Sequence, residues 1–262
     1  MSLFCKNIFK KVKRRTTLTH YYVMNKNIFS LIREFIFPCG CPVCGNNLLT
    51  AKEASNGICS DCESLFTIED AIRCSVCGKP LISERVTCLN CRNSETDNSR
   101  PKSACNSIAV YPYMGDAAHV LQAYKFGRHR NLCRFFAGKL LEASKLLNCG
   151  SDAVWVPVPP RNGKIKSSGW DQIEFIASVL EREKNINIHR CLKRLKSETQ
   201  KNLDRLARST NLKDKIICTK NVPSNIILFD DVYTTGSTIN TCAAALKKAG
   251  AEKVSGLCLY YD

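Results

Sequence analysis

The sequence predicts an α/β protein with a mainly parallel sheet, preceded by a small cysteine-rich module. Three observations carry this prediction: CxxC pairs gathered in the first half, a polar stretch after them, and strand and helix patterns that alternate from Ser107 onward. The 262 residues are enough for one large domain with a small one beside it. A content of 44% hydrophobic and 24% charged residues is that of an ordinary globular protein.

The cysteine-rich module contains eight thiols in regularly spaced pairs. These are Cys41/Cys44, Cys59/Cys62, Cys74/Cys77 and Cys88/Cys91. A two-residue gap lets both thiolates of one turn face one metal ion, and two such turns complete a tetrahedral site. We therefore expect two structural Zn²⁺ ions, because four thiolates leave no coordination place for water. Gly45 and Gly78 follow the second cysteine of their pairs, where a zinc knuckle needs a relaxed backbone.

Other arrangements of these thiols are compatible with the spacing. Neighbouring pairs would combine in chain order, but an interleaved pairing is also open. Cys39 lies beside Cys41 and is an alternative ligand. A disulfide framework is the competing interpretation, yet the 17 cysteines are an odd number and follow no secretion signal. These features favour zinc and a reducing, cytoplasmic location.

The N-terminal segment, residues 1–37, is interpreted as a basic extension with a short helix. Thr16 to Tyr22 follow its basic run, where a signal peptide would have an apolar segment. We favour a disordered tail, or a true start at Met24 instead of Met1, over a nucleic-acid-binding arm. The longest apolar stretch, residues 28–38, is too short to span a bilayer and contains two charged side chains, so no membrane span is predicted.

The formal net charge of +16 overstates how basic the folded body is. Residues 1–38 hold eight basic side chains and one acidic one, so they supply +7 and leave +9 for the rest. Eight thiolates and two Zn²⁺ ions bring that remainder to about +5. Such a charge suits phosphate ligands and is only weak support for DNA binding.

The domain organisation is expected to follow these changes in composition. After the N-terminal extension, residues 38–92 are assigned to a double zinc ribbon and residues 93–104 to a polar linker. Residues 105–262 form the α/β domain. The linker marks the ribbons as a separate module, and their low apolar content predicts that metal binding supplies their folding energy.

The second half alternates strand-like and helix-like segments. Strands are predicted at 107–113, 153–158, 226–229 and 254–260, and helices at 116–126, 132–147, 172–182 and 239–249. Ligands of such sheets bind outside the carboxyl ends of the strands. The rule points to the loop that follows the strand at 226–229.

That loop has the composition of a sugar-phosphate site. Its neutral members suit a phosphate group, because hydroxyls and the N–H groups of the following helix bind phosphate oxygens and glycine allows close approach. They are Thr234, Thr235, Gly236, Ser237 and Thr238. Asp230 and Asp231 would instead accept hydrogen bonds from ribose hydroxyls or help to hold Mg²⁺. The competing interpretation is a plain capped turn with two solvated acids.

Phe229–Thr238 closely resembles the phosphoribosyl-pyrophosphate motif of type I phosphoribosyltransferases. The chain from about residue 35 onward resembles the ComF family, competence-associated proteins with a double zinc ribbon before a phosphoribosyltransferase-like domain. The resemblance extends over further motifs: Tyr124–Gly127, Val156–Pro159, Gly169–Gln172, Thr199-Gln200 with Leu203, and Arg208 with Asn211. It implies a type I phosphoribosyltransferase fold.

The resemblance also implies roles for individual residues. Asp230 and Asp231 would contact the ribose hydroxyls, and residues 234–238 would hold the 5′-phosphate. Members of the family usually have a basic residue where this chain has Ser168, with Phe and Asn at the positions of Trp170 and Asp171. Arg161, Lys164 and Lys166 lie close enough in sequence to neutralise a pyrophosphate, although they also suit a solvated basic loop.

Residues 190–215 correspond to the mobile catalytic flap of such enzymes. The segment is basic, which suits a lid over pyrophosphate and equally a single-stranded DNA contact surface. Its lack of the aromatic residues on which bases stack favours the lid. The resemblance thus implies a protein that binds phosphoribosyl pyrophosphate with Mg²⁺, transfers phosphoribosyl to an unknown acceptor, and takes part in DNA uptake with a helicase. The alternative is a non-catalytic competence accessory protein that binds single-stranded DNA or a sugar phosphate. An orthodox purine-salvage enzyme is the weakest reading.

Overall fold

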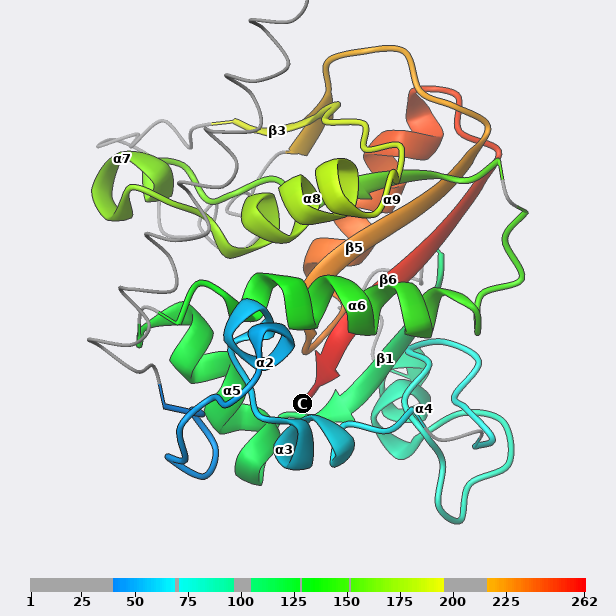
Figure 1. The fold of residues 1–262 in the computed structure, drawn as a ribbon. Coiled ribbons are helices and arrows are strands. Elements are labelled where there is room, and N and C mark those ends of the chain that lie inside the picture. Colours follow the sequence, from blue (N-terminus) through cyan, green and yellow to red (C-terminus); the bar gives the residue numbers. More distant parts are fainter. Residues whose placement is uncertain (1–39, 69–70, 97–104, 128, 151, 196–215) are drawn as a thin grey trace, which may run out of the picture.

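A computed structural model describes residues 40–68, 71–96, 105–127, 129–150, 152–195 and 216–262 (Figure 1). Its centre is a parallel sheet of four strands in the order β1-β6-β5-β2. The strands are β1 (Asn106–Pro112), β2 (Val154–Pro157), β5 (Asn225–Tyr233) and β6 (Lys253–Tyr261). The predicted fold class, an α/β domain with a mainly parallel sheet behind a small cysteine-rich module, is confirmed.

Helices cover both faces of this sheet (Figure 1). One face carries α5 (Gly115–Lys125), α6 (Leu132–Ser144) and α8 (Gln172–Glu183), and the opposite face carries α9 (Ser237–Lys248). Each predicted helix of the second half is present, with ends shifted by a few residues. Parallel strands are connected by crossover helices, and these helices bury both faces of the sheet. The strands are therefore nearly continuous apolar runs in the sequence.

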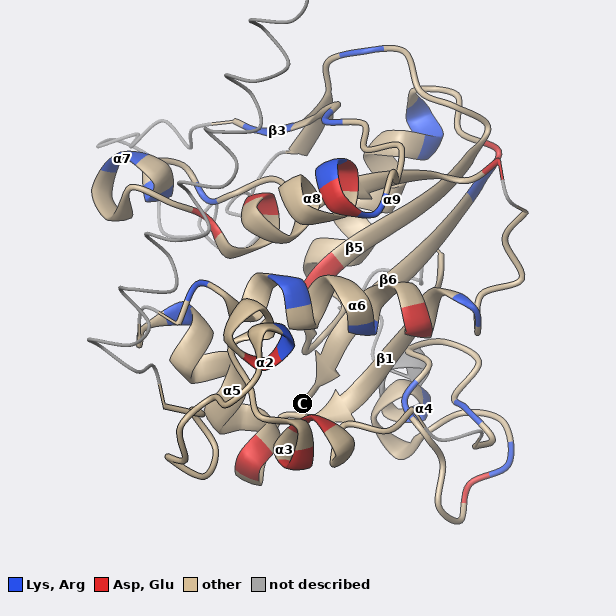
Figure 2. Ribbon diagram, in the orientation of Figure 1, with Lys and Arg blue, Asp and Glu red and all other residues tan. Residues whose placement is uncertain are grey.

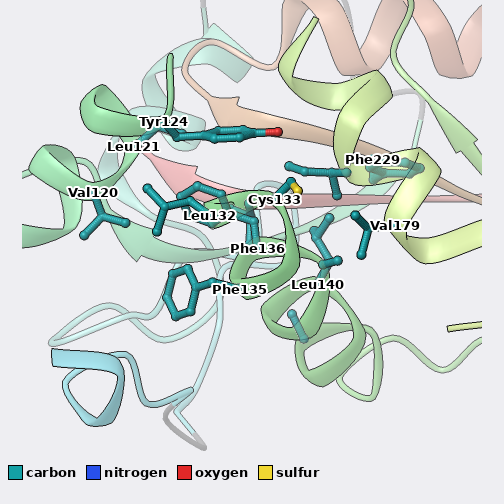
Figure 3. Close-up of a cluster of buried hydrophobic side chains, with 14 of the residues drawn as sticks. Val120, Leu121, Tyr124, Leu132, Cys133, Phe135, Phe136, Leu140, Val179 and Phe229 are labelled. Atoms are coloured by element: carbon teal, nitrogen blue, oxygen red, sulfur yellow. The ribbon is translucent and has the colours of Figure 1, made fainter. Parts of the chain in front are cut away.

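The larger core lies between the sheet and the helices α5, α6 and α8. Figure 3 shows Phe136 and Leu140 of α6 directed toward the interior that Phe229 of β5 also enters. Tyr124 of α5 is fully buried there, and its hydroxyl donates a hydrogen bond to the Gln172 carbonyl at 2.7 Å. This bond joins the end of α5 to the start of α8, close to the carboxyl ends of the strands.

The first ribbon, residues 40–68, packs on the α6 face of the sheet. It contains α2 (Ala51–Asn56) and α3 (Ser60–Ser64). Phe66 forms edge-on ring contacts with Tyr111 of β1 at 5.3 Å and with Phe135 of α6 at 5.1 Å. The Phe66 carbonyl accepts hydrogen bonds from the Tyr111 hydroxyl and from Lys139 Nζ. Ribbon residues are therefore part of the same core as the α/β residues.

The second ribbon, residues 71–96, covers the outer edge of β1 and ends in α4 (Leu89–Thr96). The Ser107 N–H donates to the Val76 carbonyl at 3.3 Å, and Arg73 Nη1 donates to the Ala109 carbonyl at 3.2 Å. Gly78 lies so close that an added Cβ would be 2.7 Å from the Ser107 carbonyl carbon. An open sheet edge invites aggregation, and here the ribbon protects it.

Packing against the α/β domain stabilises the ribbons in addition to the metal binding that the sequence predicts. Ile58 and Phe66 are buried ribbon residues, and their apolar surface contributes to folding alongside the metal. The predicted boundaries at 37, 92 and 104 stay a prediction; α4 extends to Thr96, within the segment assigned to the linker.

Several details could not be read from the sequence pattern. β5 continues to Tyr233, so Asp230 and Asp231 lie within the strand instead of in the loop after it. The short helix α7 (Lys164–Ser168) and a two-stranded antiparallel ladder of β3 (Leu192–Arg194) with β4 (Ile216–Cys218) were also not predicted. The ladder brackets residues 196–215, so most of the predicted flap, like the N-terminal extension, lies outside the described residues.

Within the part of the chain that the structure describes, no helix combines the length and apolar character needed to cross a bilayer.

Candidate metal centres and ligand site

The eight predicted thiols form two clusters, Cys41, Cys44, Cys59 and Cys62 in one and Cys74, Cys77, Cys88 and Cys91 in the other. Neighbouring pairs thus combine in chain order, and the interleaved alternative is wrong. In each cluster all four sulfur atoms lie within 4.8 Å of one another. The Cys44–Cys59 and Cys77–Cys88 sulfur distances are 3.7 and 3.8 Å. A tetrahedron with Zn–S bonds of about 2.3 Å has edges of about 3.8 Å, so both donor sets fit zinc.

Four clustered thiols cannot all ionise without a cation among them. Burial raises the pKa of the Cys77 thiol to about 12, and negative charge on Cys74 and Cys88 adds to the effect. For Cys41, backbone N–H groups of Cys59 and Cys44 outweigh burial and bring the pKa to about 7. A bound Zn²⁺ would hold all four as thiolates. Gly45 and Gly78 adopt positive φ angles of 76° and 67°, as the knuckles require.

The candidate ligand site lies at the carboxyl end of β5, where Asp230 and Asp231 provide the acidic stretch visible on that strand in Figure 2. The two carboxylates belong to opposite environments because side chains alternate along a strand. Asp231 is buried on the face of α5 and α8, while Asp230 is half-buried. Asp230 Oδ1 accepts a hydrogen bond from the Asp231 N–H at 2.9 Å, which fixes the orientation of the Asp230 carboxylate.

Two donors from different helices hold Asp231. Lys125 Nζ, from the end of α5, forms an ion pair with Asp231 Oδ2 at 2.8 Å, and Gln172 Nε2, from the start of α8, donates to the same oxygen at 2.8 Å. The Lys125 side chain is only 19% exposed, so little water screens this pair. Both contacts involve Oδ2 of Asp231.

Lys164 extends this polar network. Its Nζ forms an ion pair with Asp171 Oδ2 at 2.9 Å and also contacts Gln172 Oε1. Asp171 in turn caps α8, because its Oδ1 accepts hydrogen bonds from the Ile173 and Glu174 N–H groups. Of the predicted basic residues, Lys164 therefore joins the site, whereas Arg161 and Lys166 are exposed on the surface beside it.

The departures from the family pattern have local structural consequences. Ser168 donates through its hydroxyl to the Lys164 and Trp170 carbonyls, which closes the short helix α7. Trp170 packs edge-on against Tyr124, and the Arg130 guanidinium stacks over its ring at 5.2 Å. Asp171 provides the helix cap that an Asn would also provide, but adds a negative charge that Lys164 neutralises.

Asp230 lies in an environment that opposes its ionisation. Burial is the main cause and the neighbouring charge of Asp231 the second; together they raise the pKa of Asp230 to about 8. The Asp231 N–H and the positive charges of Lys125 and Arg194 act in the opposite direction. A carboxylate that is costly to ionise in the free protein is suited to binding a cation or a sugar hydroxyl.

The neutral half of the site is the turn from β5 into α9. Thr234, Thr235 and Ser237 are exposed, and Gly236 is the N-cap residue with φ of 72°. The first hydrogen bond of α9 runs from the Asn240 N–H to the Gly236 carbonyl, so the N–H groups of Ser237 and Thr238 have no partner within the helix. The Ser237 N–H donates a long hydrogen bond of 3.4 Å to Thr235 Oγ1. Together with the helix dipole these groups favour an anion.

The structure places Asp230 and Asp231 next to residues 234–238 at the end of β5, and Gln172 connects Lys164 with Asp231. That these residues bind a substrate stays a prediction. Sequence reasoning missed Lys125 and Gln172, although both lie in quoted motifs. The available signal was their position: Lys125 ends a helix and Gln172 begins one, and both helices are connected to carboxyl ends of parallel strands.

Three comparisons with known proteins bear on this architecture. The profile of the double zinc ribbon domain matches residues 32–93. Competence protein F of Haemophilus influenzae is 29% identical over 224 residues, covering 82% of this chain and 93% of that protein. Competence protein ComFC of Bacillus subtilis is 28% identical over 209 residues, covering 77% and 83%. A solved structure of an allosteric regulatory enzyme of purine biosynthesis is 18% identical, with a TM-score of 0.32 over 48% of this chain and 25% of that one, too low to support any argument.

The two Cys₄ clusters and the parallel sheet define a double-zinc-ribbon protein with an α/β domain. Relatives named for competence align along about four-fifths of its length at 28–29% identity, so the chain is similar to proteins of the ComF family.

Proposed function

We propose that this protein binds phosphoribosyl pyrophosphate with Mg²⁺ at residues 230–238 and transfers the phosphoribosyl group to an acceptor during DNA uptake. The observation that carries the proposal is the placement of acidic and anion-binding groups side by side at the end of β5. Two acids lie beside an anion-binding helix N-terminus, which matches a ligand with ribose hydroxyls at one end and a phosphate at the other.

The charges around the site support this proposal. Asp230 and Asp231 would receive the ribose hydroxyls or a magnesium-bound ligand, while Lys125 and Lys164 keep the net charge of the site from becoming strongly negative. Exposed Arg161 and Lys166 flank the entrance and would meet pyrophosphate. Asp171 and Gln172 hold Lys164 at the site without competing for the ligand.

The reaction would be a displacement at C1 of the ribose. The bond from C1 to the pyrophosphate oxygen breaks, a bond to a nucleophilic atom of the acceptor forms, and pyrophosphate leaves. Mg²⁺ would supply charge neutralisation of the leaving group. Positioning and electrostatics are sufficient for such a step, so no activated side-chain nucleophile is required.

A thermal-shift experiment tests the binding step. Phosphoribosyl pyrophosphate with Mg²⁺ should raise the melting temperature of the wild-type protein, and the double variant Asp230→Ala plus Asp231→Ala should lose that increase. The matched control is Asp152→Ala plus Glu252→Ala, which removes two exposed acids next to the opposite, amino ends of β2 and β6. A shift absent from the wild type, or unchanged in the Asp230 and Asp231 variant, would refute the proposal.

Transfer is tested separately by measuring pyrophosphate release in the presence of a panel of nucleobases and amines. Release that depends on one acceptor and on Asp231 supports catalysis and identifies the acceptor class. Binding without release by any acceptor would instead support the alternative function.

The alternative is a non-catalytic accessory protein that binds single-stranded DNA or a sugar phosphate. The names of the related competence proteins favour a connection with DNA. Binding to an oligonucleotide should weaken steeply with added salt, because it would rest on phosphate contacts. No binding even at low salt would remove this alternative. A cytoplasmic location and a helicase partner are further parts of the proposal, supported by the unpaired state of the described cysteines and by the competence relatives.

A further inference from the structure

We propose that the second Cys₄ cluster positions the phosphate-binding turn, with Tyr233 as the side chain that connects them. Ligand affinity at residues 234–238 would then depend on metal at Cys74, Cys77, Cys88 and Cys91, but not on metal at the first cluster. The identity of the ligand in this inference rests on the proposed function. The structural link between the second cluster and the turn is tested in the ligand-free protein.

The first observation is that the second ribbon is firmly attached to the sheet. Its knuckle at Gly78 lies directly on the β1 backbone, and a side chain there would collide with Ser107. Arg73 Nη1 bridges the Gly78 carbonyl, at 3.0 Å, and the Ala109 carbonyl of β1. A change in the shape of this knuckle therefore acts on the sheet directly.

The second observation is the position of Tyr233, the last residue of β5. Its side chain is 6% exposed and belongs to the same buried cluster as Cys74, Cys77 and Cys88. The other members of this buried cluster include Cys105, Cys242 and Cys258, so Tyr233 and the second set of thiols belong to one continuous core. The first cluster packs in the other core, with α6.

The third observation links Tyr233 to the phosphate-binding turn. Gly236, the N-cap of α9, faces the tip of the Tyr233 ring: an added Cβ would lie 2.6 Å from Tyr233 Cζ and closer still to its hydroxyl oxygen. The turn therefore rests on the ring. The Tyr233 backbone is also fixed, because its carbonyl accepts a hydrogen bond from the Asp262 N–H at 3.1 Å.

The shared buried cluster and the close approach of Gly236 to the Tyr233 ring connect the second set of thiols with the phosphate-binding turn. With Zn²⁺ bound, four thiolates are held about 3.8 Å apart and present a fixed surface to the ring. Without it, nothing holds the four sulfur atoms together, the core around the ring loosens, and Gly236 is free to move. The N–H groups of Ser237 and Thr238 then no longer point at one position, which weakens phosphate binding.

A matched pair of ligand variants tests the proposal. Cys91→Ser impairs the second cluster and Cys44→Ser the first; each should lower bound zinc from two equivalents to about one. By titration calorimetry, Cys91→Ser should weaken binding of phosphoribosyl pyrophosphate with Mg²⁺ about tenfold or more, whereas Cys44→Ser should change it by less than about threefold. Equal losses in both variants would overturn the proposal.

Hydrogen exchange of the ligand-free protein provides a readout that does not depend on the proposed function. In Cys91→Ser the amides of residues 233–240 should exchange faster, while in Cys44→Ser they should keep wild-type rates. If exchange is unchanged in both variants, the second cluster does not position the turn, whatever ligand the site binds. If exchange responds as expected but the wild-type protein binds no phosphoribosyl pyrophosphate, the proposed function is wrong. The proposal that the second cluster positions the turn is then still supported.

Substitution of the connecting side chain separates its ring from its hydroxyl. Tyr233→Phe should retain ligand affinity and slow exchange, because the ring that supports Gly236 remains. Tyr233→Leu keeps an apolar side chain of moderate size but should reproduce the Cys91→Ser effects with zinc still at two equivalents. Zinc content thus distinguishes loss of the connection from loss of the metal. Wild-type behaviour of Tyr233→Leu would refute the role of Tyr233.

Discussion

Asp230 and Asp231 are neighbours in sequence, yet they differ in what their surroundings provide. Asp231 binds a lysine and an amide directly, whereas Asp230 accepts a hydrogen bond from the Asp231 N–H and is repelled by the Asp231 charge more than Lys125 and Arg194 offset. The sheet causes the difference, because consecutive side chains of β5 point to opposite faces. The pair therefore combines one fixed carboxylate with one that readily takes up a proton or a cation.

The raised pKa of Asp230 predicts a pH-dependent stability. Because the folded-state pKa is about 8 and the ordinary value is 3.8, the folded protein binds more protons between these limits, and stability falls as pH rises through this window. Asp230→Asn should flatten that fall in a plot of melting temperature against pH. Asp152→Asn, at an exposed site, is the control, and an equal slope in wild type and Asp230→Asn would contradict the prediction.

The Lys125–Asp231 pair predicts a large and rescuable loss of stability. Lys125→Met leaves the Asp231 carboxylate buried with one neutral donor, which should cost about 3 kcal/mol in urea unfolding. Adding Asp231→Asn removes the uncompensated charge and should recover most of the loss. Purely additive destabilisation by the two substitutions would show that the pair is not coupled.

At the scale of single elements, the start of α8 contributes two residues, Asp171 and Gln172, to the candidate site. Asp171 accepts two backbone N–H bonds at the helix start and also holds Lys164, so helix capping and charge placement depend on one carboxylate. Gln172, the first helical residue, then points its amide at Asp231. The start of this helix thus helps to determine the position of the Asp231 carboxylate.

Two substitutions of Asp171 should separate these roles. Asp171→Ala removes the cap and should cost about 1–2 kcal/mol, whereas Asp171→Asn retains a capping oxygen and should cost less than about 0.5 kcal/mol. Asp171→Asn also frees Lys164 from its ion pair, so any change in ligand affinity without loss of stability belongs to Lys164. Denaturant unfolding and calorimetry measure the two effects; equal stability of both variants would contradict the capping role.

At the scale of the whole molecule, the two ribbons attach to different parts of one sheet: the first packs on the α6 face and the second covers the edge of β1. The first cluster joins the core of α5, α6 and α8, and the second joins the core of α9 (Figure 1). Phe66 is the main apolar link on the first face, since its ring contacts both Tyr111 and Phe135. Metal, ribbon and sheet are thus expected to unfold together.

Two measurements test this coupling. Freshly purified, reduced protein should contain two equivalents of zinc per chain, and an assay that finds none would overturn the zinc assignment. Phe66→Ala should destabilise the protein by about 3–5 kcal/mol in a single transition, because a large buried ring is lost from the shared core. Leu65→Ala, at a side chain that is 65% exposed, is the control and should change stability little. A separate ribbon transition in Phe66→Ala with the α/β domain unchanged would contradict the shared core.

By itself, the sequence determined the features that depend on local chemistry: the zinc-ligand spacing, the alternation of strands and helices, and the acid-and-hydroxyl sequence from Asp230 to Thr238. Tertiary structure alone decided which cysteine pairs share a metal, that Lys125 and Gln172 hold Asp231, and that the Tyr233 ring lies against Gly236. These contacts join residues far apart in the chain. The sequence pattern does not select them, because other residues of the same types could form equivalent contacts. Only the packing of helices and ribbons on the two faces of the sheet selects among them.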